Sequence, residues 1–78
     1  MTHKIFGAVW CGNCTSTKAY LDAQGIPHKY IDIDEYREIA VANNIRSLPT
    51  LITESGDRVV GLVKIKEYFS QNEHLPSN

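Results

Sequence analysis

The sequence has little cysteine, few aromatic residues and no excess of either charge. Two of its 78 residues are cysteine and one is tryptophan, and eight basic residues stand against nine acidic ones, for a formal net charge of −1. Neither sign of charge forms a run along the chain. Because a basic patch is the usual footprint of binding to nucleic acid or to an anionic membrane surface, we expect neither partner.

Long hydrophobic runs are also missing. The apolar stretch at residues 5–10 is too short to span a bilayer, and no small-residue cleavage pattern follows it, so we interpret it as a strand and expect a cytoplasmic protein. A chain of 78 residues with 42% hydrophobic content can build one small core. We therefore predict a single domain over residues 1–78, and we expect a monomer.

The hydrophobic periodicity predicts seven elements in the order β-α-β-α-β-β-α. The predicted strands cover residues 4–9, 29–34, 50–53 and 58–60, and the predicted helices cover residues 11–25, 34–44 and 62–71, with a frayed tail from Asn72. The first two strands should be parallel because a helix joins them, and the last two should form a hairpin. This order predicts an α/β fold, a four-stranded mixed sheet with helices on both faces.

Residues 29–34 have the alternation of a half-exposed edge strand. Ile31 and Ile33 share one face, whereas Asp32 and Asp34 share the other. Asp34 is then placed to cap the second helix, since aspartate is favoured before the first helical turn. The residues of that helix expected to face inward are Tyr36, Ile39 and Ala40.

The two cysteines, Cys11 and Cys14, lie at the predicted junction between the first strand and the first helix. A disulfide between them would close too small a loop to stabilise the fold appreciably, so reactivity is the better reason for the pair. Free N–H groups and the positive end of the helix dipole favour a thiolate at a helix N-terminus. We therefore predict that Cys11 is the nucleophile that attacks another disulfide. Cys14, one turn later, is predicted to resolve the mixed disulfide that forms at Cys11.

The same spacing is compatible with half of a zinc site. A closed zinc site needs four ligands, and the histidines that remain, His3, His28 and His74, are widely separated and expected at the surface. No metal or other tightly bound cofactor is therefore predicted within one chain. A dimeric module that holds a metal ion or iron–sulfur cluster between two copies of Cys11 and Cys14 remains an alternative.

Three segments of the chain resemble the thioredoxin superfamily. Residues 10–14, Trp-Cys-Gly-Asn-Cys, resemble the WCGPC active site with asparagine in place of proline, and residues 45–51 resemble the segment around the cis-proline. Val60-Gly61 is similar to the glycine that follows the last strand. The resemblance covers nearly the whole chain and implies a minimal, glutaredoxin-like thioredoxin fold that reduces protein disulfides.

The resemblance also implies where substrates bind. It implies that Pro49 is cis and lies beside the cysteine pair, so that the Leu48 backbone can add an extended substrate segment as a strand. The residues expected to contact or shape the substrate groove are Trp10, Gly12, Asn13, Leu48, Pro49, Thr50 and Gly61.

Two electron donors are compatible with the resemblance, thioredoxin reductase and glutathione. Glutaredoxins usually carry a basic residue three positions before the first cysteine and a Gly-Gly-Asp near the last strand, but this chain has Ala8 and the Val-Gly-Leu-Val of residues 60–63. Both differences favour thioredoxin reductase. Thioredoxins carry a buried aspartate six residues before the first cysteine, where this chain has Ile5. Short redoxins of this length reduce ribonucleotide reductase, which makes that enzyme a candidate substrate.

Overall fold

The elements follow one another in the predicted order. The computed structural model describes residues 2–73, with strands β1 (His3–Gly7), β2 (His28–Asp32), β3 (Thr50–Ile52) and β4 (Arg58–Val60) and helices α1 (Gly12–Ala23), α2 (Arg37–Ala42) and α3 (Leu62–Glu73). Asn72, where a frayed tail was predicted to begin, lies within α3, and the rest of that predicted tail, with His74 and Pro76, lies outside the described residues. None of the described helices is long and apolar enough to cross a bilayer.

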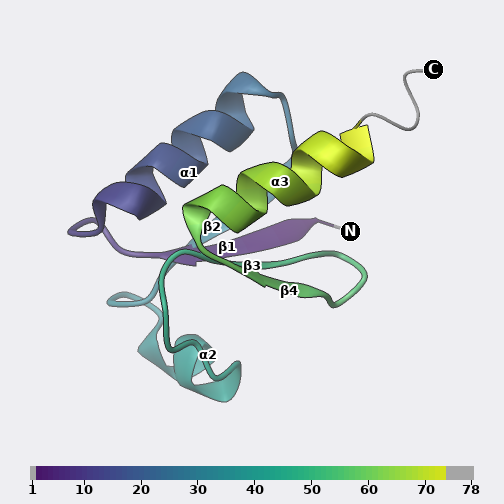
Figure 1. Cartoon of the computed structure of the whole chain (residues 1–78). Coiled ribbons are helices and arrows are strands. Elements are labelled where there is room, and N and C mark those ends of the chain that lie inside the picture. The colour runs from purple at the N-terminus through teal and green to yellow at the C-terminus, as the bar shows by residue number, and fades with distance from the viewer. Residues whose placement is uncertain (1, 74–78) are drawn as a thin grey trace.

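The sheet has the strand order β2-β1-β3-β4. β1 and β2 are parallel, whereas β3 is antiparallel to both β1 and β4. Helices α1 and α3 lie side by side on one face of the sheet, and α2 covers the other face (Figure 1). The predicted α/β fold is therefore confirmed, and β2 is the edge strand that the alternation predicted.

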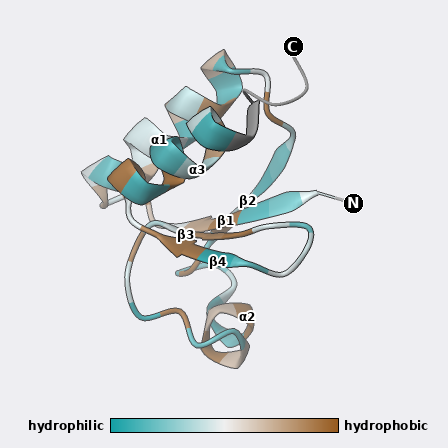
Figure 2. Ribbon diagram, turned by 45° about the vertical axis from the view of Figure 1, so that its right-hand side comes forward, coloured by the Kyte–Doolittle hydropathy of each residue, from teal (hydrophilic) through white to brown (hydrophobic). Residues whose placement is uncertain are grey.

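Neighbouring residues of β1 supply the two halves of the core, because side chains alternate across a strand. Ile5 packs under α1 and α3 with Leu21, Leu51, Ile65 and Phe69, and Phe6 packs toward α2 with Ile31 and Ala40. Parts of β1 and most of β3 carry the hydrophobic colour in Figure 2. His3, predicted at the surface, is instead half-buried, with its ring edge-on to that of Phe69 at 5.2 Å between centroids.

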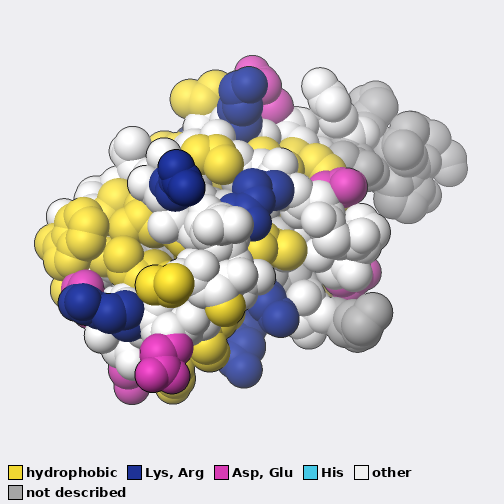
Figure 3. All heavy atoms as spheres, turned by 90° about the horizontal axis from the view of Figure 1, so that it is seen from below, with side chains coloured by type: hydrophobic (Ala, Val, Ile, Leu, Met, Phe, Trp, Pro, Cys, Tyr) yellow, Lys and Arg dark blue, Asp and Glu magenta, His cyan; other side chains and the backbone are white. Residues whose placement is uncertain are grey.

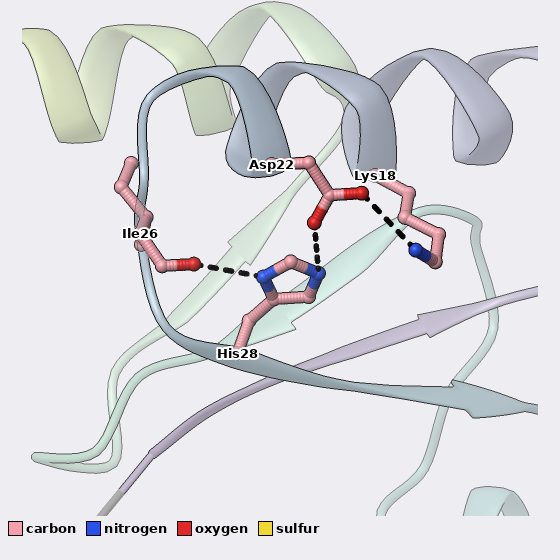
Figure 4. Close-up of polar contacts among 4 residues, drawn as sticks. All are labelled: Lys18, Asp22, Ile26 and His28. Atoms are coloured by element: carbon pink, nitrogen blue, oxygen red, sulfur yellow. Dashed lines mark hydrogen bonds and ion pairs between the residues drawn. The ribbon is translucent and has the colours of Figure 1, made fainter.

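His28 is also not the surface residue that was predicted. Its side chain is only 7% exposed and lies between the end of α1 and the start of β2 (Figure 4). Nδ1 is 2.9 Å from the carbonyl oxygen of Ile26, and Nε2 is 3.7 Å from one carboxylate oxygen of Asp22, whose other oxygen pairs with Lys18 at 3.1 Å. The imidazole thus connects the turn after α1 to the helix itself.

The segment between β2 and α2 differs from the prediction. Asp34 does not cap α2, since the residue before the helix is Tyr36; the Asp34 N–H donates to Oδ1 of Asp32 at 2.8 Å and closes a turn. That turn delays the start of the helix, which has only six residues. Only Ala40 therefore reaches the core, whereas Tyr36 and Ile39, predicted to face inward, are 47% and 44% exposed.

Candidate active site

The cysteine pair lies where β1 leads into α1. Cys11 is the N-cap residue of α1, in an extended conformation, and its N–H donates to the carbonyl of Ala8 at 3.1 Å. Both cysteines are free thiols. Cys11 is partly exposed, whereas Cys14, in the first turn of the helix, is fully buried. A substrate disulfide can therefore reach Cys11 and not Cys14.

The two thiols differ in acidity because of what surrounds each sulfur. The pKa of Cys11 lies below its ordinary value of 9.0, chiefly because the Cys14 thiol donates a hydrogen bond to it and also because the Asn13 and Cys14 backbone N–H groups stabilise the thiolate. Burial, first, and the hydrogen bond to Cys11 together raise the pKa of Cys14 to about 12. At neutral pH Cys11 is thus the more nucleophilic thiol.

A groove of about 350 Å³ lies beside Cys11. Its lining residues come from the active-site loop, from the turn after β2 and from the loop before β3: Trp10, Cys11, Ile33, Ile45, Arg46 and Leu48. Figure 3, which views the molecule from the α2 side, shows hydrophobic side chains gathered at the left, the end where β1 leads into α1 in Figure 1. The groove is mostly apolar, with one cationic side chain.

Trp10 forms one wall of this groove and is 66% exposed. Its indole N–H donates to Oδ2 of Asp34 at 2.8 Å. Asp34 therefore orients the indole rather than capping α2. The sequence offered no signal for this pairing, because 24 positions separate the two residues.

The loop before β3 carries the other predicted substrate-binding residues. The Leu48–Pro49 peptide bond is cis. Thr50 is buried, and its hydroxyl donates to the carbonyl of Ser47 at 2.6 Å. Gly61, at φ +98°, donates its N–H to the carbonyl of Pro49 at 2.9 Å. Leu48 thus lines the groove, whereas Thr50 and Gly61 fix the shape of the loop behind it.

Two residues of this site were not identified from the sequence, Gly7 and Tyr30. A Cβ added to Gly7 would lie 2.5 Å from the Tyr30 hydroxyl oxygen and 2.9 Å from Cβ of Cys14. Tyr30 is on the face of β2 that the alternation assigned to solvent, but α1 and α3 cover that face, and its ring packs against the core. Glycine in the first strand was the available signal, because glycine in a strand often marks a close approach.

Gly7→Ala is expected to destabilise the protein by about 1–3 kcal/mol, because the added methyl group overpacks the contact between Tyr30 and Cys14. Gly12→Ala is the matched control, since a Cβ at Gly12 meets no atom within 4 Å. That control is expected to change stability little or to raise it by about 0.4–1 kcal/mol. Urea unfolding measures both. Equal stabilities for the two variants would contradict this packing argument.

Among residues 2–73, no three histidine, cysteine, aspartate or glutamate side chains are grouped as a metal site would require. A metal or cluster bound by Cys11 and Cys14 would therefore need ligands from a second chain or from a small molecule.

The mixed sheet, the three helices and the cysteine pair beside a cis-proline loop define the class of thioredoxin-fold redoxins. The glutaredoxin family model matches residues 4–55. The chain belongs to the glutaredoxin family within the thioredoxin superfamily, and its family and fold support a thiol–disulfide oxidoreductase.

Named relatives include both thioredoxins and glutaredoxins. A thioredoxin of Mycoplasma genitalium is 36% identical, in a match that covers 83% of this chain and 76% of that protein. The structure of a glutaredoxin from Methanosarcina mazei Go1 is similar at a TM-score of 0.74 and 28% identity, over 90% of this chain and 76% of the other. The structure of a Plasmodium falciparum thioredoxin is similar at a TM-score of 0.72 and 26% identity, over 90% of this chain and 69% of the other.

Proposed function

We propose that this protein reduces disulfides of other proteins through Cys11 and Cys14. The observation that carries the proposal is the contrast between the two thiols: one is partly exposed, beside a groove and acidic, and the other is buried behind it. The Cys11 thiolate attacks one sulfur of the substrate disulfide, forms a mixed disulfide and releases the other sulfur as a thiol. Cys14 then attacks the Cys11 sulfur, which releases the second substrate thiol and leaves the Cys11–Cys14 disulfide.

Substrate binding is assigned to the groove between Trp10 and Leu48. Both side chains offer apolar surface, and the Leu48 backbone can pair with an extended substrate segment by strand addition. Gly12 and Asn13, which are exposed beside Cys11, are assigned to the same contact surface. No tightly bound cofactor is needed, and ribonucleotide reductase is a candidate substrate.

The electron donor we propose is a thioredoxin-reductase-like enzyme of the cytoplasm. Ala8 is fully buried, so the position where glutaredoxins usually carry a basic residue offers neither charge nor access to solvent. The stretch after β4 has no aspartate at residues 60–63. Glutathione is the second candidate, because the chain belongs to the glutaredoxin family and because Arg46 in the groove could pair with a glutathione carboxylate.

The test supplies NADPH and a protein disulfide such as that of insulin, together with either thioredoxin reductase or glutathione and its reductase. We expect this protein to sustain NADPH oxidation at least about tenfold faster with thioredoxin reductase than with glutathione. Turnover in the glutathione arm and not in the thioredoxin reductase arm would show that glutathione is the donor. The proposed reduction of protein disulfides by Cys11 and Cys14 would still stand. No turnover with either donor would contradict the proposed function itself.

A further inference from the structure

The Tyr30 side chain lies over the neighbouring strand β1, with its hydroxyl beside the buried Cys14. Tyr30 pairs with Ile5 in the parallel register of β1 and β2, on the face covered by α1 and α3. Its hydroxyl oxygen and Cβ of Cys14 both lie within 3 Å of one point, the position above Gly7 where a side chain would begin. The two groups are therefore neighbours, and they can approach each other because Gly7 has no side chain to separate them.

The resolving step needs a negative charge on Cys14, which its surroundings oppose. Burial is the largest cause that raises its pKa in the dithiol, and it remains in the mixed disulfide, where Cys11 carries no charge; the Ala8 N–H is the neighbour that lowers the pKa. Ile5, two residues before Gly7 on the same face of β1, is fully buried and can neither accept a proton nor donate a hydrogen bond. A further donor beside the Cys14 sulfur would favour the thiolate.

We propose that the Tyr30 hydroxyl donates a hydrogen bond to the Cys14 sulfur as that sulfur becomes a thiolate and attacks the mixed disulfide. The inference rests on the function proposed above. In the step it assists, a bond forms between the Cys14 and Cys11 sulfurs, and the bond between Cys11 and the substrate sulfur breaks. The substrate sulfur leaves with the electron pair and takes up the proton lost by Cys14, directly or through water.

Two further observations support a donor role for this hydroxyl. Burial, then the charges of Cys14, Asp32 and Cys11, raise the pKa of Tyr30 above 10.0, so the hydroxyl keeps its proton at neutral pH. The ring accounts for the packing of Tyr30 against the core, and the hydroxyl has no hydrogen-bond partner among residues 2–73. Packing therefore requires only the ring, and the polar group is available to the sulfur.

Tyr30→Phe tests the proposal because it removes the hydroxyl and keeps the ring. The reduced protein is mixed with one equivalent of an aromatic disulfide whose thiolate product is coloured, such as 5,5′-dithiobis(2-nitrobenzoate). Attack by Cys11 releases the first coloured product, and resolution by Cys14 releases the second. Tyr36→Phe is the matched control, since Tyr36 is exposed beside α2.

In Tyr30→Phe we expect the second release to be about tenfold slower at pH 7 and its pH profile to move about one unit upward, with the first release unchanged. Tyr36→Phe should match the natural protein in both phases. A second phase within twofold of the natural protein, with the same pH profile, would overturn the role of Tyr30. A natural protein that shows no second phase would instead overturn the proposed function, so the two failures are distinguishable.

A purely structural role for the hydroxyl predicts a different pattern. It would lower the unfolding midpoint of Tyr30→Phe and slow both phases together, without moving the pH profile of the second. Thermal unfolding of the two tyrosine variants therefore accompanies the kinetics. An unchanged pH profile with a lowered midpoint would contradict the proposal.

Discussion

Replacing Cys11 with serine is expected to abolish disulfide reduction, with a loss of at least about a thousandfold. A serine hydroxyl is not ionised at neutral pH, so the two backbone N–H groups and the Cys14 thiol that favour a charged sulfur have no anion to stabilise. Cys14 cannot take over, because it is fully buried and its pKa is about 12. Insulin reduction with dithiothreitol as the donor measures the loss independently of any reductase.

The companion variant, Cys14→Ser, is expected to retain the first attack and lose the second. Cys11 should then accumulate as a mixed disulfide with the substrate, which intact-protein mass spectrometry detects as an added substrate mass. Ser16→Ala, an exposed position on the same helix, is the control and should trap nothing. Full turnover by Cys11→Ser would contradict the assigned order of the two cysteines. A mixed disulfide trapped on Cys14 in the Cys11→Ser protein would reverse it.

Much of the fold follows from local pattern. The alternation on β2, the helical spacing after Cys11 and the glycine at residue 25 each depend on residues close together in the chain. Gly25 adopts φ +68° just past α1, and the Ile26 N–H donates to the Leu21 carbonyl at 3.0 Å, as the helix-ending signal predicts. The position of the cysteine pair at the strand–helix junction follows in the same way.

The parts of the site that the sequence did not reveal depend on contacts between distant segments. Asp34 has the residue type and position of a helix cap, but its carboxylate bonds to the Trp10 indole. Tyr30 lies on the same face of β2 as Asp32, the polar face of the alternation, but helices from elsewhere in the chain cover it. Local periodicity shows that a strand has two faces, and only the tertiary fold decides what covers each of them.

The burial that hides Cys14 also predicts a large difference in reactivity between the thiols. With the Cys11 pKa below 9.0 and that of Cys14 about 12, the thiolate fraction of Cys11 at pH 7 is at least about a thousandfold larger. The more basic Cys14 thiolate is intrinsically more nucleophilic, which offsets about twenty- to thirtyfold of this ratio. We therefore expect iodoacetamide to alkylate Cys11 at least about thirtyfold faster, and the full burial of Cys14 widens the gap.

The ratio of the two alkylation rates is expected to fall as the pH rises above the pKa of Cys11. Below both pKa values the two rates rise together with pH, so their ratio stays constant. Above the pKa of Cys11 its rate levels off, whereas the rate of Cys14 continues to rise toward pH 12, so the ratio falls. Peptide mass spectrometry after brief alkylation measures both sites, with protein unfolded in urea as the control in which the two should react alike. Equal labelling of the folded protein at pH 7 would contradict the acidity difference on which the proposed mechanism depends.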